Sequence, residues 1–100
     1  MKIFFSETDP DVILNKILSE LKTRELGKIV NFELENDGDM VLTISKLGKS
    51  KLFFKRATLN DGLEFKLFKE KIALSHRPLK ESVTSKIFKI IEKIGGKIEA

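Results

Sequence analysis

The sequence predicts an α+β domain: a two-layer sandwich in which an antiparallel β-meander of four to six strands carries an N-terminal and a C-terminal helix on one face. Three observations lead to this prediction. Apolar residues recur at helical spacing near both ends of the chain, they alternate with polar residues through the middle, and short runs of Asn, Asp and Gly separate the alternating stretches. Striped helices and an alternating sheet bury these apolar surfaces against each other. We expect a single domain over residues 1–100.

The first helix is expected at about residues 10 to 25. Asp9 and Pro10 provide a capping side chain and a proline whose fixed φ suits the first helical position. Five apolar residues at helical spacing then form one stripe: Ile13, Leu14, Ile17, Leu18 and Leu21. Glu7, Asp9 and Asp11 could together attract a hard cation, but the rest of a calcium loop is absent. We interpret these acids as helix-capping residues and predict no metal site.

From Lys28 the apolar period changes to two, which predicts a meander of four or five strands over residues 28 to 74. Turns are expected at 36–39, 47–50 and 60–62, where Asn, Asp and Gly tolerate positive φ. A tight turn at Lys69-Glu70 should precede a last short strand at about residues 71 to 74. Residues 1 to 5 could add an edge strand.

Arg56 interrupts the alternation, because a strict period of two would turn its charge toward the core. We therefore expect a strand that ends before Arg56, a bulge near Ala57, or a pairing of Arg56 with Glu64 across the hairpin.

The second helix is expected to begin at Pro78 and to stop at Gly95-Gly96. Its apolar face consists of residues at helical spacing: Leu79, Val83, Ile87, Ile90, Ile91 and Ile94. Lysines fall in its later turns, where cations interact favourably with the carbonyl end of the helix.

Charge is divided unevenly along the chain. Residues 1–45 carry five Lys/Arg against nine Asp/Glu, and residues 46–100 carry fourteen against six, so the two parts are −4 and +8 and sum to +4. The absence of Cys excludes disulfides, and no apolar stretch approaches the roughly 18 to 20 residues that cross a bilayer. We expect a soluble cytoplasmic protein that does not associate with membranes and requires no cofactor.

His76 is the only histidine, and with Arg77 and Glu81 nearby it could act as a general base. No nucleophile motif accompanies it, so we interpret it as a polar residue in the connection from the last strand to the second helix. The sequence therefore predicts no enzyme.

The candidate site is the face of the sheet that the helices leave uncovered. Leu52, Phe54, Leu63, Phe65 and Leu67 are expected to face the helices, together with their neighbours in the core. Alternation then sends the partner-binding candidates to the other face, beside Val41, Thr43 and Ala73: Lys51, Phe53, Lys55, Lys66, Phe68 and Lys71.

Three functions follow from this arrangement. A protein interface is the leading hypothesis: a small non-catalytic binding or assembly module that acts through this basic face and self-associates. Single-stranded nucleic acid is the second, because aromatics can stack on bases while lysines track phosphates. The third is a small apolar ligand, or an enzyme, with a pocket between sheet and helices.

Overall fold

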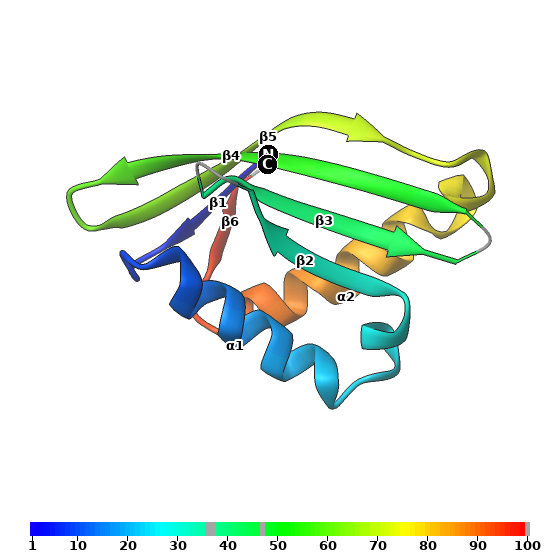
Figure 1. Cartoon of the computed structure of the whole chain (residues 1–100), viewed down its shortest axis with the longest axis horizontal. Coiled ribbons are helices and arrows are strands. Elements are labelled where there is room, and N and C mark those ends of the chain that lie inside the picture. Colours follow the sequence, from blue (N-terminus) through cyan, green and yellow to red (C-terminus); the bar gives the residue numbers. More distant parts are fainter. Residues whose placement is uncertain (36–37, 47, 100) are drawn as a thin grey trace.

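The strands of the protein form one antiparallel sheet, and both α-helices cover the same face of it (Figure 1). This computed structural model describes residues 1–35, 38–46 and 48–99, apart from the side chains of Leu79 and Lys80. In the described residues, the elements follow one another as β1 (Lys2–Phe5), α1 (Pro10–Lys22), the 3₁₀ helix η1 (Glu25–Lys28), β2 (Val30–Leu34), β3 (Met40–Ser45), β4 (Lys49–Leu59), β5 (Gly62–Lys71), the 3₁₀ helix η2 (Leu74–Leu79), α2 (Lys80–Lys93) and β6 (Lys97–Glu99). The predicted α+β fold class is confirmed.

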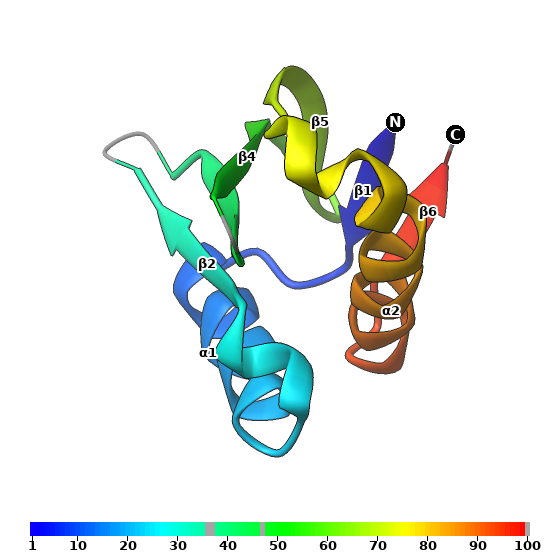
Figure 2. The ribbon, with the colours of Figure 1, turned by 90° about the vertical axis from the view of Figure 1, so that its right-hand side faces the viewer.

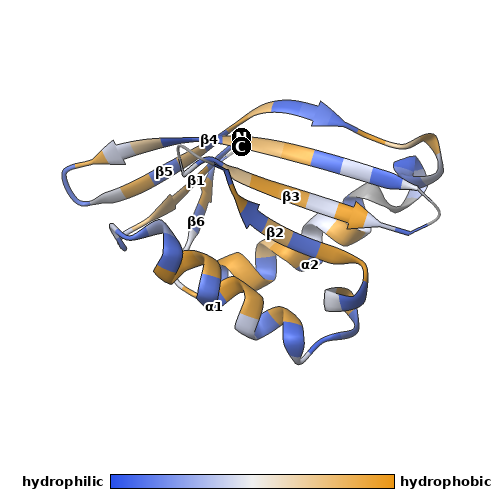
Figure 3. Ribbon diagram, viewed as in Figure 1, coloured by the Kyte–Doolittle hydropathy of each residue, from blue (hydrophilic) through white to orange (hydrophobic). Residues whose placement is uncertain are grey.

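The core lies between the sheet and the helices, which Figure 2 shows as two columns below the strands. Strand residues such as Phe54 and Phe65 and helix residues such as Ile17 and Ile87 are almost completely buried there. In Figure 3 apolar and hydrophilic segments alternate along both helices, and the buried apolar residues belong to the core with those of the strands. No helix in the described part of the chain is long and apolar enough to cross a membrane.

Helix α1 begins where the sequence predicts. The Asp9 side chain accepts a hydrogen bond from the Asp11 backbone N–H at 2.9 Å, which satisfies one of the free donors of the first turn. The helix ends at Lys22, three residues before the predicted end, because the Arg24 N–H bonds back to the Leu21 carbonyl and the chain turns into η1.

The strand order is β2-β3-β4-β5-β1-β6. Residues 1 to 5 do join the sheet, but the predicted edge position is wrong: β1 lies between β5 and β6 and pairs antiparallel with both. Gly62 allows this insertion, because a Cβ at this position would clash with the carbonyl oxygen of Phe5. Strand β6 was not predicted, since three residues after a helix stop carry almost no periodicity.

The predicted turn at Lys69-Glu70 and the strand at residues 71 to 74 are wrong. β5 continues to Lys71, and residues 74–79 form η2. The alternation breaks at this point because of a β-bulge: Phe53 is opposite Lys69 whereas Phe54 is opposite Leu67, which leaves Phe68 as the extra residue of β5. A bulge and a turn both interrupt a period of two, so the sequence could not distinguish them.

The expectation for Arg56 is also wrong, because β4 runs on to Leu59 without a bulge near Ala57. The Arg56 backbone N–H donates to the Asp39 Oδ1 at 2.9 Å. Its half-buried side chain lies over Gly38, whose φ is +82° and where a Cβ would meet the guanidinium group. The charge therefore leaves the core by reaching along the sheet to the β2–β3 connection. Residue 56 is opposite Phe65 and not Glu64 in the register.

Candidate functional site

The side chains of strand β4 alternate between the two faces of the sheet. Leu52 and Phe54 are buried against the helices, whereas Lys51 and Lys55 are exposed on the opposite side and Phe53 between them is half-buried. Antiparallel pairing places residues that are directly opposite each other on the same face. The outer face can therefore be followed from strand to strand through the register.

The bulge brings β5 into this face. Phe68 lies beside Phe53, with ring centroids 6.3 Å apart, and the Lys69 Nζ lies 5.4 Å from the centroid of the Phe53 ring. Because the extra residue shifts the alternation, Lys71 returns to the outer side, opposite Lys51. Phe68 is 56% exposed, the most exposed aromatic side chain in the described part of the chain. Sequence reasoning missed Lys69, which it placed in a turn.

Lysines lie directly opposite one another on this surface. Lys55 of β4 is opposite Lys66 of β5, and Lys66 is opposite Lys2 of β1, so three lysines form one row across adjacent strands, which ends at Glu99 of β6, opposite Lys2. Lys51 and Lys71 make a second like-charge pair. We call this surface the lysine face and define it by eight residues: Lys2, Lys51, Phe53, Lys55, Lys66, Phe68, Lys69 and Lys71. It contains all six candidates from the sequence and adds two residues: Lys2, which the position of β1 reveals, and Lys69, which the bulge reveals.

The lysine face has a small apolar centre. Val41, opposite Phe53 in the register, is only 5% exposed although it belongs to the outer face and not to the main core. Thr43 is half-buried opposite Lys51. The Phe53 ring therefore covers Val41, and an apolar strip with Phe68 at its exposed end is bordered by cations. Three acids lie on the same side of the sheet: Glu33 opposite Val41, Glu64 opposite Phe4, and Glu99 opposite Lys2.

His76 is buried, with 3% of its surface exposed, and both ring nitrogens are hydrogen-bonded. Its Nδ1 lies 2.5 Å from the Oγ of Ser50, and its Nε2 is bonded to the backbone carbonyl of Lys46. Ser50 Oγ also accepts the Ala73 N–H at 2.9 Å. One assignment satisfies every group: Nε2–H donates to Lys46, and the Ser50 hydroxyl donates to Nδ1. This network, which we call the His76 clamp, ties η2 to the start of β4.

Ser50 and His76 have the residue types of a catalytic nucleophile and its base, but their surroundings do not suit catalysis. Ser50 is 0% exposed and its oxygen already accepts a backbone N–H, so no substrate carbonyl can reach it. Arg77 and Glu81 are exposed, and neither contacts the His76 ring nitrogens. The geometry supports a structural role for His76. Sequence reasoning missed Ser50, which is one of many serines in the chain and has no local signal.

Glu20 joins the two helices on the other side of the sheet. Its carboxylate binds the Lys93 ammonium of α2 and the Arg24 guanidinium, both at 3.2 Å. The Lys93 hydrogen bond, followed by that of Arg24, holds the pKa of Glu20 below its ordinary value of 4.5. Beyond this junction a cleft of about 530 Å³ opens between η1 and α2, and its lining includes neither His76 nor Arg56.

The acids of the N-terminal connection bond to backbone groups. Glu7 accepts the N–H groups of Thr8 and Asp9, and Asp9 caps α1. In the described residues no cluster of three or more His, Asp or Glu side chains could hold a metal ion. Comparisons with protein-family models, curated proteins and solved structures find no match to this chain. The function is therefore argued from the surfaces themselves.

Proposed function

We propose that the protein is a non-catalytic binding module that docks an acidic protein partner on the lysine face. One observation supports this proposal above the others: the row of Lys55, Lys66 and Lys2. Like charges directly opposite one another destabilise a sheet, so the pairs Lys55–Lys66 and Lys66–Lys2 oppose folding, while Glu99 lies opposite Lys2 only. A partner that supplies carboxylates removes this repulsion and gains favourable charge pairs, which steer its approach and fix its register.

The contacts around the row fit an interface. Phe53, Phe68 and Val41 supply an apolar centre, and the lysines supply a polar rim. In the described part of the chain, no side chain forms a salt bridge with any lysine of this face. The cations are therefore available to a partner.

The test is a titration of the protein with a fluorescent Glu-rich peptide at several salt concentrations. We expect binding that weakens as salt is added, because the contacts are electrostatic and exposed. The double variant Lys55→Glu/Lys66→Glu should abolish it. The matched control, Lys22→Glu/Lys89→Glu, makes the same change in net charge on exposed helix positions and should bind nearly as the parent does. Equal losses in both variants would mean that only net charge matters and would overturn the proposal.

Single-stranded nucleic acid is the second candidate, favoured by the 56% exposure of the Phe68 ring beside the lysine row. An oligothymidylate of about ten nucleotides, within the usual range of site sizes, is the probe. The same oligonucleotide without bases is its control, because it keeps the phosphates and removes the stacking. Tighter binding of the intact oligonucleotide than of the peptide, with a clear loss on removal of the bases, would favour this candidate over the protein partner.

Self-association is the form of the proposal in which the partner is another copy. Two lysine faces cannot meet, because their ammonium rows would repel, so the contact would be head to tail, with the acidic N-terminal part of one chain on the lysine face of the next. Light scattering at low and high salt tests this directly. A monomer at high protein concentration in low salt would exclude it and leave binding to other acidic partners.

A further inference from the structure

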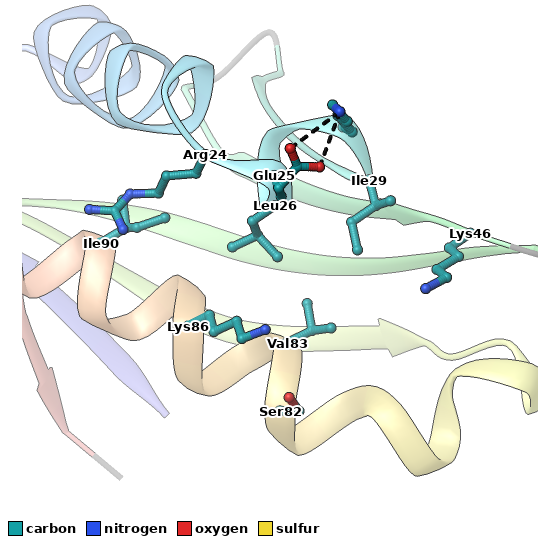
Figure 4. A pocket seen from close by; sticks show the side chains of 10 residues that line it. Arg24, Glu25, Leu26, Ile29, Lys46, Ser82, Val83, Lys86 and Ile90 are labelled. Carbon is teal, nitrogen blue, oxygen red and sulfur yellow. Dashed lines mark hydrogen bonds and ion pairs between the residues drawn. The ribbon is translucent and has the colours of Figure 1, made fainter.

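A cleft lies between η1 and α2 and extends from Arg24 and Ile90 to Lys46 (Figure 4). Arg24, which lines the cleft, is paired with Glu20, and Glu20 also binds Lys93 of α2. Ile90, three residues before Lys93, lines the cleft just beyond this junction, and the far end reaches Lys46 in the β3–β4 connection. The cleft is thus separate from the lysine face and lies on the opposite side of the sheet.

The floor of the cleft is apolar. Leu26 of η1 and Ile29, the residue that follows η1, point toward α2 in Figure 4, where Val83 and Ile90 line the other side of the cleft. Leu26 and Ile29 pack against the core but are only half-buried, so part of their apolar surface remains open. Val83 and Ile90 are already 9% and 3% exposed, so a ligand with a hydrocarbon part would bury mainly the open surface of Leu26 and Ile29.

The rim of the cleft is cationic. Arg24, Lys28, Lys46 and Lys86 line it against a single acid, Glu25. Glu25 pairs with Lys28 at 3.1 Å, and Arg24 pairs with Glu20. Lys46 and Lys86 form no salt bridge with any side chain that the structure describes. Two ammonium groups on opposite walls are therefore available to an anion.

The wall that carries Lys46 is held in place. The Lys46 carbonyl accepts a hydrogen bond from His76 Nε2, and the neighbouring Ser45 N–H donates to the Ile29 carbonyl at 2.7 Å. The His76 clamp on one side and η1 on the other thus fix the backbone at the mouth of the cleft. A site whose walls are fixed before binding loses less entropy when the ligand arrives.

We propose that this cleft binds a small amphiphile with one hydrocarbon chain and one carboxylate. The chain lies on Leu26, Ile29, Val83 and Ile90, and the carboxylate lies between Lys46 and Lys86. The volume of about 530 Å³ falls within the range of small-molecule sites, roughly 300 to 1,000 Å³. A neutral molecule of the same length would leave both ammonium groups without a partner, and a short anion would leave the floor exposed.

The experiment titrates the full chain, labelled at its methyl groups, with dodecanoate below its micelle concentration. We expect one molecule bound per chain, with the largest shifts in the NMR signals of Leu26, Ile29 and Val83. The neutral 1-dodecanol should bind about tenfold more weakly, and acetate should not bind detectably, because each lacks one of the two contacts. No dodecanoate binding, or equal binding of the alcohol, would overturn the proposal.

Variants test the position of the headgroup. Lys46→Gln and Lys86→Gln should each weaken dodecanoate binding about tenfold. Lys89→Gln removes the same charge from an exposed position of α2 outside the cleft and should leave the affinity unchanged. An equal loss with Lys89→Gln would contradict the assigned headgroup site. Lys55→Glu/Lys66→Glu should leave dodecanoate binding unchanged, because these lysines lie on the lysine face. The cleft proposal and the lysine-face proposal can therefore fail independently of each other. Loss of dodecanoate binding in that variant would also contradict the proposed cleft site.

Discussion

The two faces of the sheet differ most clearly at Phe53 and Phe54, which are neighbours in the chain. Phe54 is 2% exposed among the core residues, whereas Phe53 lies on the outer face under the Lys69 ammonium and beside Phe68. On the inner face the aromatic ring stabilises the fold, because it belongs to the close-packed apolar core. On the outer face Phe53 packs beside Val41 and is surrounded by lysines that repel one another. Burial of apolar side chains on the inner face thus stabilises the fold, whereas the like charges on the outer face destabilise it.

The largest expected effect is on the free energy of unfolding, and it differs between the two faces. Phe54→Ala should lower the free energy of unfolding by about 3 to 5 kcal/mol, since it leaves a cavity in the core. Phe53→Ala should lower it by only about 1 kcal/mol, the scale of a cross-strand pair with a cation–π contact. Urea denaturation of both variants gives the comparison. Equal losses would mean that the outer face is also a packed core.

The second effect concerns the His76 clamp. Ser50→Ala should lower the free energy of unfolding by about 1 to 3 kcal/mol, because it leaves the Ala73 N–H and the His76 Nδ1 without partners in a buried site. Ser45→Ala is the matched control, since Ser45 is exposed at the end of β3. Urea denaturation checks both variants. A loss below about 0.5 kcal/mol, the range of ordinary surface substitutions, would contradict the described network.

A smaller effect has the opposite sign. Lys66→Glu places a carboxylate between Lys55 and Lys2 and should raise the free energy of unfolding by about 0.2 to 1 kcal/mol, while it weakens binding of the Glu-rich peptide. Thermal denaturation and the peptide titration measure the two quantities on one sample. Lys89→Glu, on the helix side, should change neither to a comparable extent. A variant that loses both stability and binding would argue against repulsion within the row.

The smallest effect lies at the junction of the helices. The pKa of Glu20 is lower in the folded protein than its ordinary value of 4.5, so its ion pairs stabilise the fold at pH values above 4.5. This stabilisation is lost as the pH falls through the pKa of the folded state. Glu20→Gln should therefore lower the melting temperature at neutral pH and match the parent at a pH well below 4.5. Glu92→Gln, at an exposed position of α2, serves as the control. A difference that persists unchanged in acid would rule out the ion pairs as its cause.

Much of the candidate site could be predicted from residue patterns alone. Lys51, Phe53 and Lys55 lie on the outer face because they alternate with Leu52 and Phe54, which are apolar and buried. Lys2 and Lys69 could not be found in this way. Lys2 reaches the face only because β1 pairs with β5, and Lys69 only because the bulge shifts the alternation. Pairing and bulges depend on residues that are distant in the chain.

The sequence by itself determined the fold class, the two helices and the side of the sheet on which most residues lie. These properties follow from the local spacing of apolar residues, because the spacing alone shows which side of a helix or strand must be buried. The tertiary structure alone decided the strand order, the like-charge rows, the His76 clamp and the cleft. Each of these depends on which distant segments meet, as when Ser50 contacts His76 or Lys66 lies between Lys55 and Lys2. Such contacts are set by packing of the whole chain and leave no periodic signal in any one stretch of it.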